Sequence, residues 1–493
     1  MRLGDLAADI EECEFRGGSN AGATSLARVA GITADSREVS EGFVFAAISG
    51  TEQDGAVFIP AALSQGAVAI LATPKAAANL DAAVPVLVAA NPRAVLAELA
   101  ARFYDHQPET ICAVTGTNGK TSVASFLRQI WSHEGKSAAS LGTLGVVLEC
   151  EMRVLGYTTP DPVTLHRHLN DLALEGVSHV VLEASSHGLA QHRLDGVSIA
   201  AGALTNLSRD HLDYHADFDE YLAAKLRLFT DVVSERGAAV LNAEADCYEA
   251  AVAACEARRL TVLSVGSYAE GLKLNSCMAH GKGLSLDIAF GGRDYHVELP
   301  LMGAFQASNA LVAAGLALAT GSDGPRVFEA LGNLEGAEGR VQLIGRSEHG
   351  GLVFVDYAHT PDALQTVLKS IRPHTERRLH VVFGAGGDRD KGKRPQMGRI
   401  ATDFADVTIV TDDNPRNEDP ADIRAEIMKV APGALEIGDR KEAITQAIAG
   451  LESGDVLIVA GKGHESGQTV NGVTHPFKDA DVVREILGEG GIL

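Results

Sequence analysis

A chain of 493 residues is too long for a single hydrophobic core, and its length predicts about three domains of ordinary size. The formal net charge of −23 argues against nucleic acid or an anionic membrane as a partner, because both are bound through clustered lysine and arginine. The six cysteines show no C-x-x-C pair or metal-ligand spacing, which fits a reducing compartment. No signal core or membrane-length apolar run is present, so we expect a soluble, cytoplasmic protein.

Strand-like and helix-like segments alternate from the first part of the chain. Short buried strands are expected at residues 42–50, 67–73 and 84–90. An alanine-rich helix is expected at residues 95–106, and the polar residues 106–108 resemble a linker. Residues 1–107 are therefore predicted to form a first α/β domain.

A second series of strands and helices follows the linker. Its strands are expected at residues 110–116, 137–143, 179–185, 199–208, 238–244 and 261–266. Helical stretches separate these strands, and that alternation is typical of a parallel sheet. A glycine-rich β segment at 281–300 and an apolar helix at 305–321 complete a predicted central domain of residues 108–334.

The last part of the chain repeats the pattern of alternating strands and helices. Strands are expected at residues 351–357, 380–386, 406–412 and 455–461. Residues 335–493 are therefore predicted to form a third α/β domain. Ligands of open α/β sheets bind beyond the carboxyl ends of the strands, and nearly every strand predicted here runs straight into a polar cluster.

The polar cluster "TGTNGKTS", residues 115–122, is typical of a phosphate-binding loop between a strand and a helix. It is shorter than the common G-x-x-x-x-G-K-[ST] loop, because Val114 stands where that pattern has its first glycine. Lys120 can reach the β- and γ-phosphate oxygens of a nucleotide, and the Thr121 hydroxyl can bind Mg²⁺. A simple glycine-rich turn is the plainer interpretation of this stretch.

Three further residues have a plain and a functional interpretation. Glu183 ends the apolar strand at 179–185, where an acid is usually a cap or a satisfied buried carboxylate. Beside a nucleotide loop in the same sheet, it becomes a candidate metal ligand. His211, in "RDHLDYH", belongs either to a solvated turn or to a metal and phosphate site, and Lys225 would ordinarily be a helix-surface lysine.

Nine segments in chain order together resemble the Mur ligase family. They are "GTNGKTS", "LEASSHGL", "TNLSRDHLDYH", "YLAAKLRLF", "GAFQASNALVAAGLA", "VDYAHTPDAL", "GGDRDKGKRPQMG", "DNPRNEDP" and "GKGHE". Each motif is weak alone, but the set covers essentially the whole chain. The resemblance implies an N-terminal uridine-binding α/β domain, a central P-loop ATPase-like parallel-sheet domain and a C-terminal Rossmann-like domain.

The resemblance also implies the reaction. It is an ATP-dependent amide-bond ligation that adds meso-2,6-diaminopimelate to UDP-N-acetylmuramoyl-L-alanyl-D-glutamate through an acyl phosphate, in cytoplasmic peptidoglycan precursor synthesis. Lys120, Lys225 and His211 are implied as catalytic. Two Mg²⁺ ions are implied, one held by Thr121 and Glu183, and the other by His211 and a carbamylated Lys225. The implied ATP-binding residues are Gly116, Thr117, Asn118, Gly119, Lys120, Thr121, Ser122 and Asn309.

The substrate-binding residues come from the same resemblance. Those implied for the UDP-muramoyl dipeptide are Ser36, with the loop of residues 50–55, and Thr158, Thr159, Ser185, Gln191 and Arg193. Those implied for diaminopimelate are Arg389, Asp413, Asn414, Pro415, Arg416, Gly461 and Glu465. The chemistry of Arg416 agrees, because diaminopimelate has a distal carboxylate that lysine lacks and a guanidinium can bind it bidentately.

Other functions remain open at this point. One is a different ligase of the same architecture, such as a lysine-adding enzyme or a folylpolyglutamate synthetase; the latter usually has a shorter chain without the N-terminal uridine domain. Another is a non-catalytic nucleotide sensor, which loss of Lys120, Glu183 or Lys225 would favour, although all three are present. We expect a monomer.

Overall fold

The computed structural model describes residues 1–10, 13–16, 26–50, 53–78, 80, 84–208, 214–281 and 283–488. Its backbone contacts divide the chain into two compact units. One unit comprises Met1–Lys120, Trp131–Leu263 and Leu316–Gly321, and the other comprises Thr121–Ile130, Ser264–Gly315 and Ser322–Leu493. Each unit is α/β, as the alternation of strands and helices predicts.

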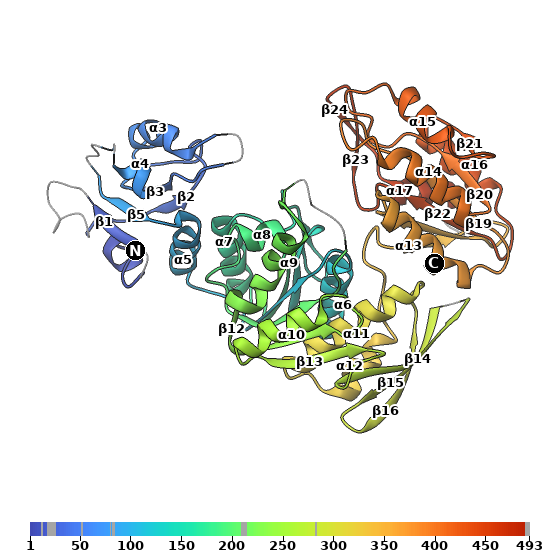
Figure 1. Ribbon diagram of the computed structural model, residues 1–493, viewed down its shortest axis with the longest axis horizontal. Helices are drawn as coiled ribbons and strands as arrows, with labels where there is room; N and C mark the ends of the chain where they lie inside the picture. Colours follow the sequence, from blue (N-terminus) through green and yellow to red (C-terminus); the bar gives the residue numbers. More distant parts are fainter. Residues whose placement is uncertain are drawn as a thin grey trace. The chain divides into compact units, whose positions relative to one another are not determined.

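The N-terminal part, blue in Figure 1, contains a five-stranded sheet in the order β1-β5-β4-β3-β2. Its strands are β1 (Cys13–Arg16), β2 (Gly31–Thr33), β3 (Phe43–Ala46), β4 (Ala69–Ala72) and β5 (Val86–Ala89). Its helices are α1 (Leu3–Leu6), η1 (Gly55–Phe58), α3 (Ile59–Ser64), α4 (Pro74–Ala77) and α5 (Pro92–Phe103). Strands β2 to β5 are parallel, and β1 is antiparallel to β5.

Both faces of this sheet are buried. Leu87 in β5 packs in a cluster with Leu96 and Leu99 of α5, whereas the adjacent Val86 packs with Ile59 of α3. Strands covered on both faces read as continuous apolar runs, which is why the three central strands were predictable. The strands β1 and β2 were not predicted.

The central sheet contains strands in the order β12-β11-β6-β10-β7-β8-β9. These are β6 (Thr110–Thr115), β7 (Ala138–Gly142), β8 (Gly145–Val147), β9 (Met152–Arg153), β10 (His179–Glu183), β11 (Ile199–Leu204) and β12 (Val233–Asn242), and β13 (Thr261–Gly266) follows in the chain. The associated helices are α6 (Lys120–His133), α7 (Pro162–Leu174), α8 (Ser186–Ala190), α9 (Phe218–Arg227), the π-helical turn η2 (Leu228–Val232) and α10 (Tyr248–Ala257). The pairs among β7, β10, β6, β11 and β12 are parallel, as predicted.

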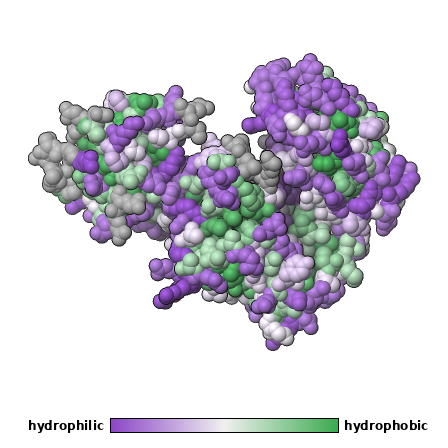
Figure 2. Space-filling view, in the orientation of Figure 1, coloured by the Kyte–Doolittle hydropathy of each residue, from purple (hydrophilic) through white to green (hydrophobic). Residues whose placement is uncertain are grey.

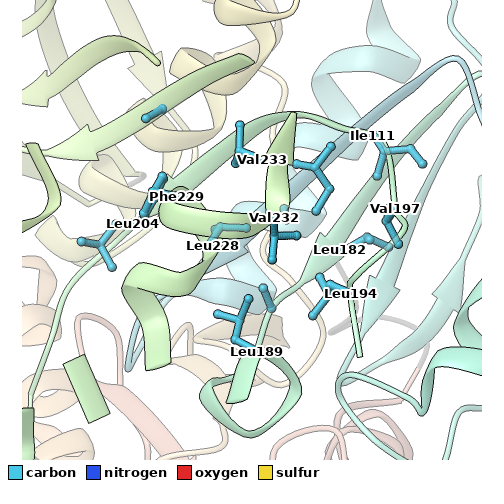
Figure 3. Close-up of a cluster of buried hydrophobic side chains, with 14 of the residues drawn as sticks. Ile111, Leu182, Leu189, Leu194, Val197, Leu204, Leu228, Phe229, Val232 and Val233 are labelled. Atoms are coloured by element: carbon cyan, nitrogen blue, oxygen red, sulfur yellow. The ribbon is translucent and has the colours of Figure 1, made fainter. Parts of the chain in front are cut away.

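A single hydrophobic cluster fills one side of this sheet. Ile111, Leu182 and Leu204 come from three neighbouring strands, and Leu228 and Phe229 from the chain just after α9 (Figure 3). The helices begin at local signals. The Asp161 carboxylate accepts from the Val163 and Thr164 amides to cap α7, and the Asp217 carboxylate accepts from the Glu220 amide to cap α9.

An antiparallel ribbon and two helices come next in the chain. They are β14 (Leu272–His280), β15 (Gly283–Phe290), β16 (Arg293–Leu299), α11 (Ala304–Ala319) and α12 (Gly324–Leu331). The strands pair in sequence order, β14 with β15 and β15 with β16. The β character expected at 281–300 and the helix expected at 305–321 are both confirmed.

The C-terminal part contains a six-stranded sheet in the order β17-β18-β22-β19-β20-β21 and a separate hairpin. The strands are β17 (Gln342–Arg346), β18 (Leu352–Asp356), β19 (Leu379–Phe383), β20 (Val407–Val410), β21 (Leu435–Glu436), β22 (Val456–Ala460), β23 (Gly467–Val470) and β24 (Val473–Pro476). The helices are α13 (Pro361–Ile371), η3 (Arg372–His374), α14 (Lys393–Phe404), α15 (Pro420–Met428), α16 (Arg440–Ala449) and α17 (Asp479–Leu487). All neighbours in the sheet are parallel except β17, which is antiparallel to β18.

Hydrophilic residues cover much of the face seen in Figure 2, with smaller hydrophobic areas between them. None of the helices in the described ranges combines the length and apolar character that a membrane crossing needs. The cysteines form no disulfide in the described part of the chain.

Candidate active site

The glycine-rich loop follows β6 and leads into α6, where the sequence predicts it. Gly116 and Gly119 adopt φ of 145° and 89°, a region that side chains other than glycine rarely enter. A Cβ on Gly116 would lie 1.9 Å from the Thr205 hydroxyl oxygen, so only glycine fits there. Lys120 Nζ donates to the carbonyl oxygens of Gly116 and Thr117, each at 2.9 Å. The ammonium group therefore lies over the loop, where it can meet a phosphate.

The end of the neighbouring strand β11 braces this loop. The Thr205 hydroxyl donates to the Asn118 carbonyl at 2.6 Å, and the Asn206 side-chain oxygen accepts from the Asn118 amide at 2.9 Å. The Thr117 hydroxyl lies 3.1 Å from the Tyr221 hydroxyl of α9. Sequence reasoning missed this brace, although "TNLS" directly follows a strand that pairs with β6, which was a usable signal.

We predict that Thr205→Val weakens nucleotide binding. Valine keeps the shape of threonine but cannot donate to the Asn118 carbonyl, so the loop loses a buried hydrogen bond. The KM for ATP should rise about three- to tenfold, the effect of one ordinary hydrogen bond. Steady-state kinetics checks this, with Thr366→Val on the exposed side of α13 as control. An unchanged KM for ATP would show that the brace is dispensable.

Two buried charged residues lie close to the same loop. Glu183, at the end of β10 and 3% exposed, accepts from the Thr143 amide at 2.8 Å and the Thr143 hydroxyl at 3.1 Å. Lys225, on α9 and 1% exposed, donates to the Gly116 carbonyl at 2.8 Å. Lys225 is thus not the helix-surface lysine of the plain interpretation. Its Nζ also lies 4.4 Å from the centre of the Tyr221 ring.

The structure describes three of the four residues implied as metal ligands, Thr121, Glu183 and Lys225. Glu183 pairs in register with Val114 of β6, next to the glycine-rich loop, and Thr121 is buried in the first turn of α6. Carboxylate and hydroxyl oxygens are ligands that suit Mg²⁺, so these two residues fit the ion. His211 lies outside the described residues. Within the described ranges, no group of three or more His, Cys, Asp or Glu side chains is arranged to hold a metal.

The residues implied for the peptide end of the sugar nucleotide come together. The Thr159 hydroxyl donates to the Glu183 carbonyl at 2.7 Å and accepts from the Ser185 amide at 3.0 Å. Arg193 donates to the Thr159 carbonyl at 2.6 Å and to the Gln191 side-chain oxygen at 2.8 Å. Burial lowers the pKa of the Arg193 guanidinium.

Thr158 and Ser36 were implied for the sugar nucleotide, and Asn309 was implied for ATP. The Thr158 hydroxyl lies 3.1 Å from that of Thr143, which also bonds Glu183. Ser36 lies in a half-buried turn after β2, and Thr51 and Glu52 of the 50–55 loop fall outside the described residues. Asn309 is buried in α11, where its amide donates to the Gln306 side-chain oxygen at 3.0 Å.

The residues implied for diaminopimelate gather at the carboxyl ends of β19, β20 and β22, except Arg389, which is exposed. Arg416 has a left-handed backbone with φ of 54°, and its guanidinium donates to the Gly387 carbonyl at 2.8 Å. The Gly387 amide in turn donates to the Asn414 carbonyl at 2.9 Å. Pro415, which lies between Asn414 and Arg416 in the chain, is buried. Gly461 packs closely against Asp413, because a Cβ on Gly461 would lie 2.7 Å from an Asp413 carboxylate oxygen. The "GGDR" and "DNPR" segments are therefore tied together.

Lys462 is a buried residue of this site that sequence reasoning missed. Its ammonium, 0% exposed, donates to the Asn414 side-chain oxygen at 3.1 Å, to Glu465 at 3.0 Å and to the Gly467 carbonyl at 2.7 Å. The Asn414 amide also donates to Glu465 at 2.9 Å. Lys462 therefore fixes Asn414 and Glu465, two of the residues that were predicted to contact the amino acid. Its position inside "GKGHE" was the available signal.

Comparison with known proteins identifies the family. Three family models match the chain: "Mur ligase family, catalytic domain" at residues 28–104, "Mur ligase middle domain" at 114–317 and "Mur ligase, glutamate ligase domain" at 339–463. The chain belongs to the Mur ligase family. The Mur ligase resemblance and the three-part α/β architecture are thereby confirmed.

Relatives with curated names extend over nearly the whole chain. The UDP-N-acetylmuramoyl-L-alanyl-D-glutamate--2,6-diaminopimelate ligase of Rhizobium meliloti (strain 1021) is 52% identical over 467 residues, 95% of this chain and 96% of that protein. The ligase of the same name from Brucella melitensis biotype 1 is 53% identical over 451 residues, 92% of each chain.

Solved structures of Mur ligases share the fold. A structure of the same named ligase has a TM-score of 0.71 at 34% identity and covers 93% of this chain and 94% of its own. A Mycobacterium tuberculosis folylpolyglutamate synthase has a TM-score of 0.63 at 18% identity, with 80% of this chain and 95% of its own covered. At that identity the likeness concerns the fold alone.

Proposed function

We propose that the chain is an ATP-dependent ligase that joins meso-2,6-diaminopimelate to UDP-N-acetylmuramoyl-L-alanyl-D-glutamate. The observation that carries the proposal is the near full-length identity of about half to ligases of this name, together with an intact phosphate loop. The reaction belongs to peptidoglycan precursor synthesis. We place it in the cytoplasm, where ATP is available.

The chemistry requires activation of a carboxylate, which is a poor electrophile. The terminal carboxylate of the dipeptide takes the γ-phosphoryl group of ATP, and the amine then attacks the acyl phosphate and displaces phosphate. Lys120 and the loop amides hold the β- and γ-phosphates, and Asn309 contacts the adenine. Arg193, Gln191 and Ser185 hold the dipeptide. Fixing two anions in line is the larger part of the catalysis.

The donor set fits bound Mg²⁺. Thr121 and Glu183 would hold one ion, and His211 with a carbamylated Lys225 would hold a second. Bound Mg²⁺ supplies positive charge that offsets the charge of the two reacting anions. Lys225 contributes to the same region by holding the Gly116 carbonyl, which fixes the first residue of the loop.

The C-terminal residues select the amine. Arg416 and Arg389 supply cationic groups for the distal carboxylate of diaminopimelate, and Glu465 supplies an anionic group for the ammonium. We further propose that residues 1–107 bind the uridine end, 108–334 bind ATP and 335–493 bind the amino acid. The matches of three separate family models support this division.

A substrate panel tests the proposal. Purified protein with ATP, Mg²⁺ and the UDP-muramoyl dipeptide should form a tripeptide product with diaminopimelate at least about a hundredfold faster than with lysine, ornithine or glutamate. The readouts are ADP release and the mass of the product. Faster turnover with lysine would support the lysine-adding alternative. Turnover of a folate with glutamate, and none of the dipeptide, would support a folylpolyglutamate synthetase.

A further inference from the structure

A short loop links α8 to β11 and carries two of the residues proposed to hold the dipeptide, Gln191 and Arg193. The core anchors the chain on both sides of His192, since Leu189 and Leu194 are buried in the hydrophobic cluster of the central sheet (Figure 3). Between these anchors, His192 has φ of 59°, a left-handed conformation that costs free energy in a residue other than glycine. The fold therefore holds His192 in place against local strain.

The imidazole of His192 bonds to the cap of α5. The Asn91 side-chain oxygen accepts from the Arg93 and Ala94 amides, at 3.2 and 3.4 Å, and so caps that helix. This use of the oxygen leaves the amide nitrogen to face His192 Nε2, at 2.8 Å. An amide nitrogen only donates, so Nε2 accepts and the ring proton of a neutral His192 lies on Nδ1.

The Nδ1 proton then points at a carboxylate. His192 Nδ1 lies 2.7 Å from Asp195 Oδ2, and Arg227 donates to both oxygens of Asp195, at 2.9 and 2.7 Å. Arg227 Nη2 also lies 2.8 Å from His192 Nδ1. Burial tends to raise the pKa of Asp195, but hydrogen bonds from His192 and Arg227 outweigh it and lower that pKa.

Arg227 connects this network to the helix of the active site. It lies two residues after Lys225 in α9, and it also donates to the Leu189 carbonyl at 2.8 Å. The buried His166 of α7 meets the Asp195 carbonyl at 3.0 Å. The loop is therefore held from α5, α7 and α9 at once.

We propose that His192 is a positioning residue for the dipeptide carboxylate. Through Asn91 and Asp195 it fixes the loop that presents Gln191 and Arg193, and through Arg227 it sets that loop relative to α9. The inference rests on the proposed function, because it concerns how the same site receives its sugar-nucleotide substrate. It adds four residues, Asn91, His192, Asp195 and Arg227, that hold the loop carrying the binding residues and are not themselves proposed to contact the substrate.

The first test is His192→Asn. Asparagine tolerates the left-handed backbone but is too short to join Asn91 to Asp195. The KM for the UDP-muramoyl dipeptide should rise about tenfold or more, since small displacements of a binding group cost this much. The KM for diaminopimelate should stay within about twofold, a split that a general loss of stability would not produce. Arg259→Asn is the matched control, because Arg259 is exposed and also left-handed, with φ of 56°.

A double-mutant cycle tests the relay itself. Asn91→Ser keeps a capping oxygen for α5 but has no amide to meet His192, so it should also raise the KM for the dipeptide. If Asn91 acts through His192, the double variant should be no worse than His192→Asn alone. Additive effects, or a rise in both KM values together, would overturn the proposal.

The outcomes separate this inference from the proposed function. Wild-type protein and Arg259→Asn must first form the tripeptide product, and failure there would reject the function. Product formation with an unchanged dipeptide KM in both single variants would reject only the role of His192. If His192→Asn does not fold, Asn91→Ser alone decides, since it preserves the helix cap.

Discussion

Lys225→Ala should lower kcat for ligation by about a hundred- to a thousandfold, while the protein remains folded. Lys225 is almost fully buried and its Nζ donates to the Gly116 carbonyl, so alanine removes a support of the phosphate loop and the proposed carbamate together. A carbamate keeps one N–H, which can still donate to Gly116, and adds oxygens suited to Mg²⁺. The two roles of the side chain are therefore compatible.

Chemical rescue separates these roles. A short carboxylic acid should partly restore activity to Lys225→Ala, because it can supply the oxygens but not the link to Gly116. ¹³C-bicarbonate should give a carbamate signal in the NMR spectrum of wild-type protein that the variant lacks. Lys441→Ala, on the surface of α16, is a control for loss of a lysine charge. Wild-type turnover in Lys225→Ala would end the idea.

Arg416→Ala should raise the KM for diaminopimelate by about two orders of magnitude and leave the KM values for ATP and the dipeptide nearly unchanged. A site built for a carboxylate loses affinity when its donor is removed, because the ligand's charge is left without a partner. The side chain also ties the "DNPR" segment to Gly387, so part of the loss should come from disorder of the pocket.

The left-handed backbone of Arg416 calls for a second variant. Alanine is strained at φ of 54°, whereas asparagine tolerates it, so Arg416→Asn isolates the guanidinium from the backbone. Both variants should behave alike if the guanidinium matters. Arg399→Ala, exposed on α14, controls for loss of positive charge. Unchanged kcat/KM for diaminopimelate in Arg416→Asn would mean that "DNPR" is only a turn.

Most of the strands that the sequence predicts are buried on both faces, although β13 was also predicted and is only partly buried, and the buried β2 was missed. The strands β6, β10 and β22 are unbroken apolar runs, and a parallel sheet covered by helices accounts for such runs. The strands β8, β9 and β21 have two or three residues each and no detectable period, and so they escaped prediction. These short strands form because they pair with neighbouring strands of the sheet, and their own residues do not indicate that pairing.

In the candidate site, too, some residues could be predicted from the sequence and others could not. Lys120, Glu183 and Arg416 stand in motifs, and motifs are local in the sequence. The brace from Thr205, the ammonium of Lys462 and the relay through His192 join residues that are far apart in the chain or inside unremarkable segments. Such contacts exist only after the sheets have formed; for Thr205 and Lys462 the available signal was their place in a polar segment that follows a strand, which does not name the partner residue.

The contacts of Lys120 with its own loop have a consequence for nucleotide binding. The ammonium group bonds two backbone carbonyls, so the folded loop is held by contacts within the protein itself. When ATP binds, the Lys120 ammonium exchanges the carbonyl oxygens of Gly116 and Thr117 for phosphate oxygens as acceptors. Binding then does not have to order a flexible segment. The conformational entropy that an unformed loop would lose at that step has already been lost in folding.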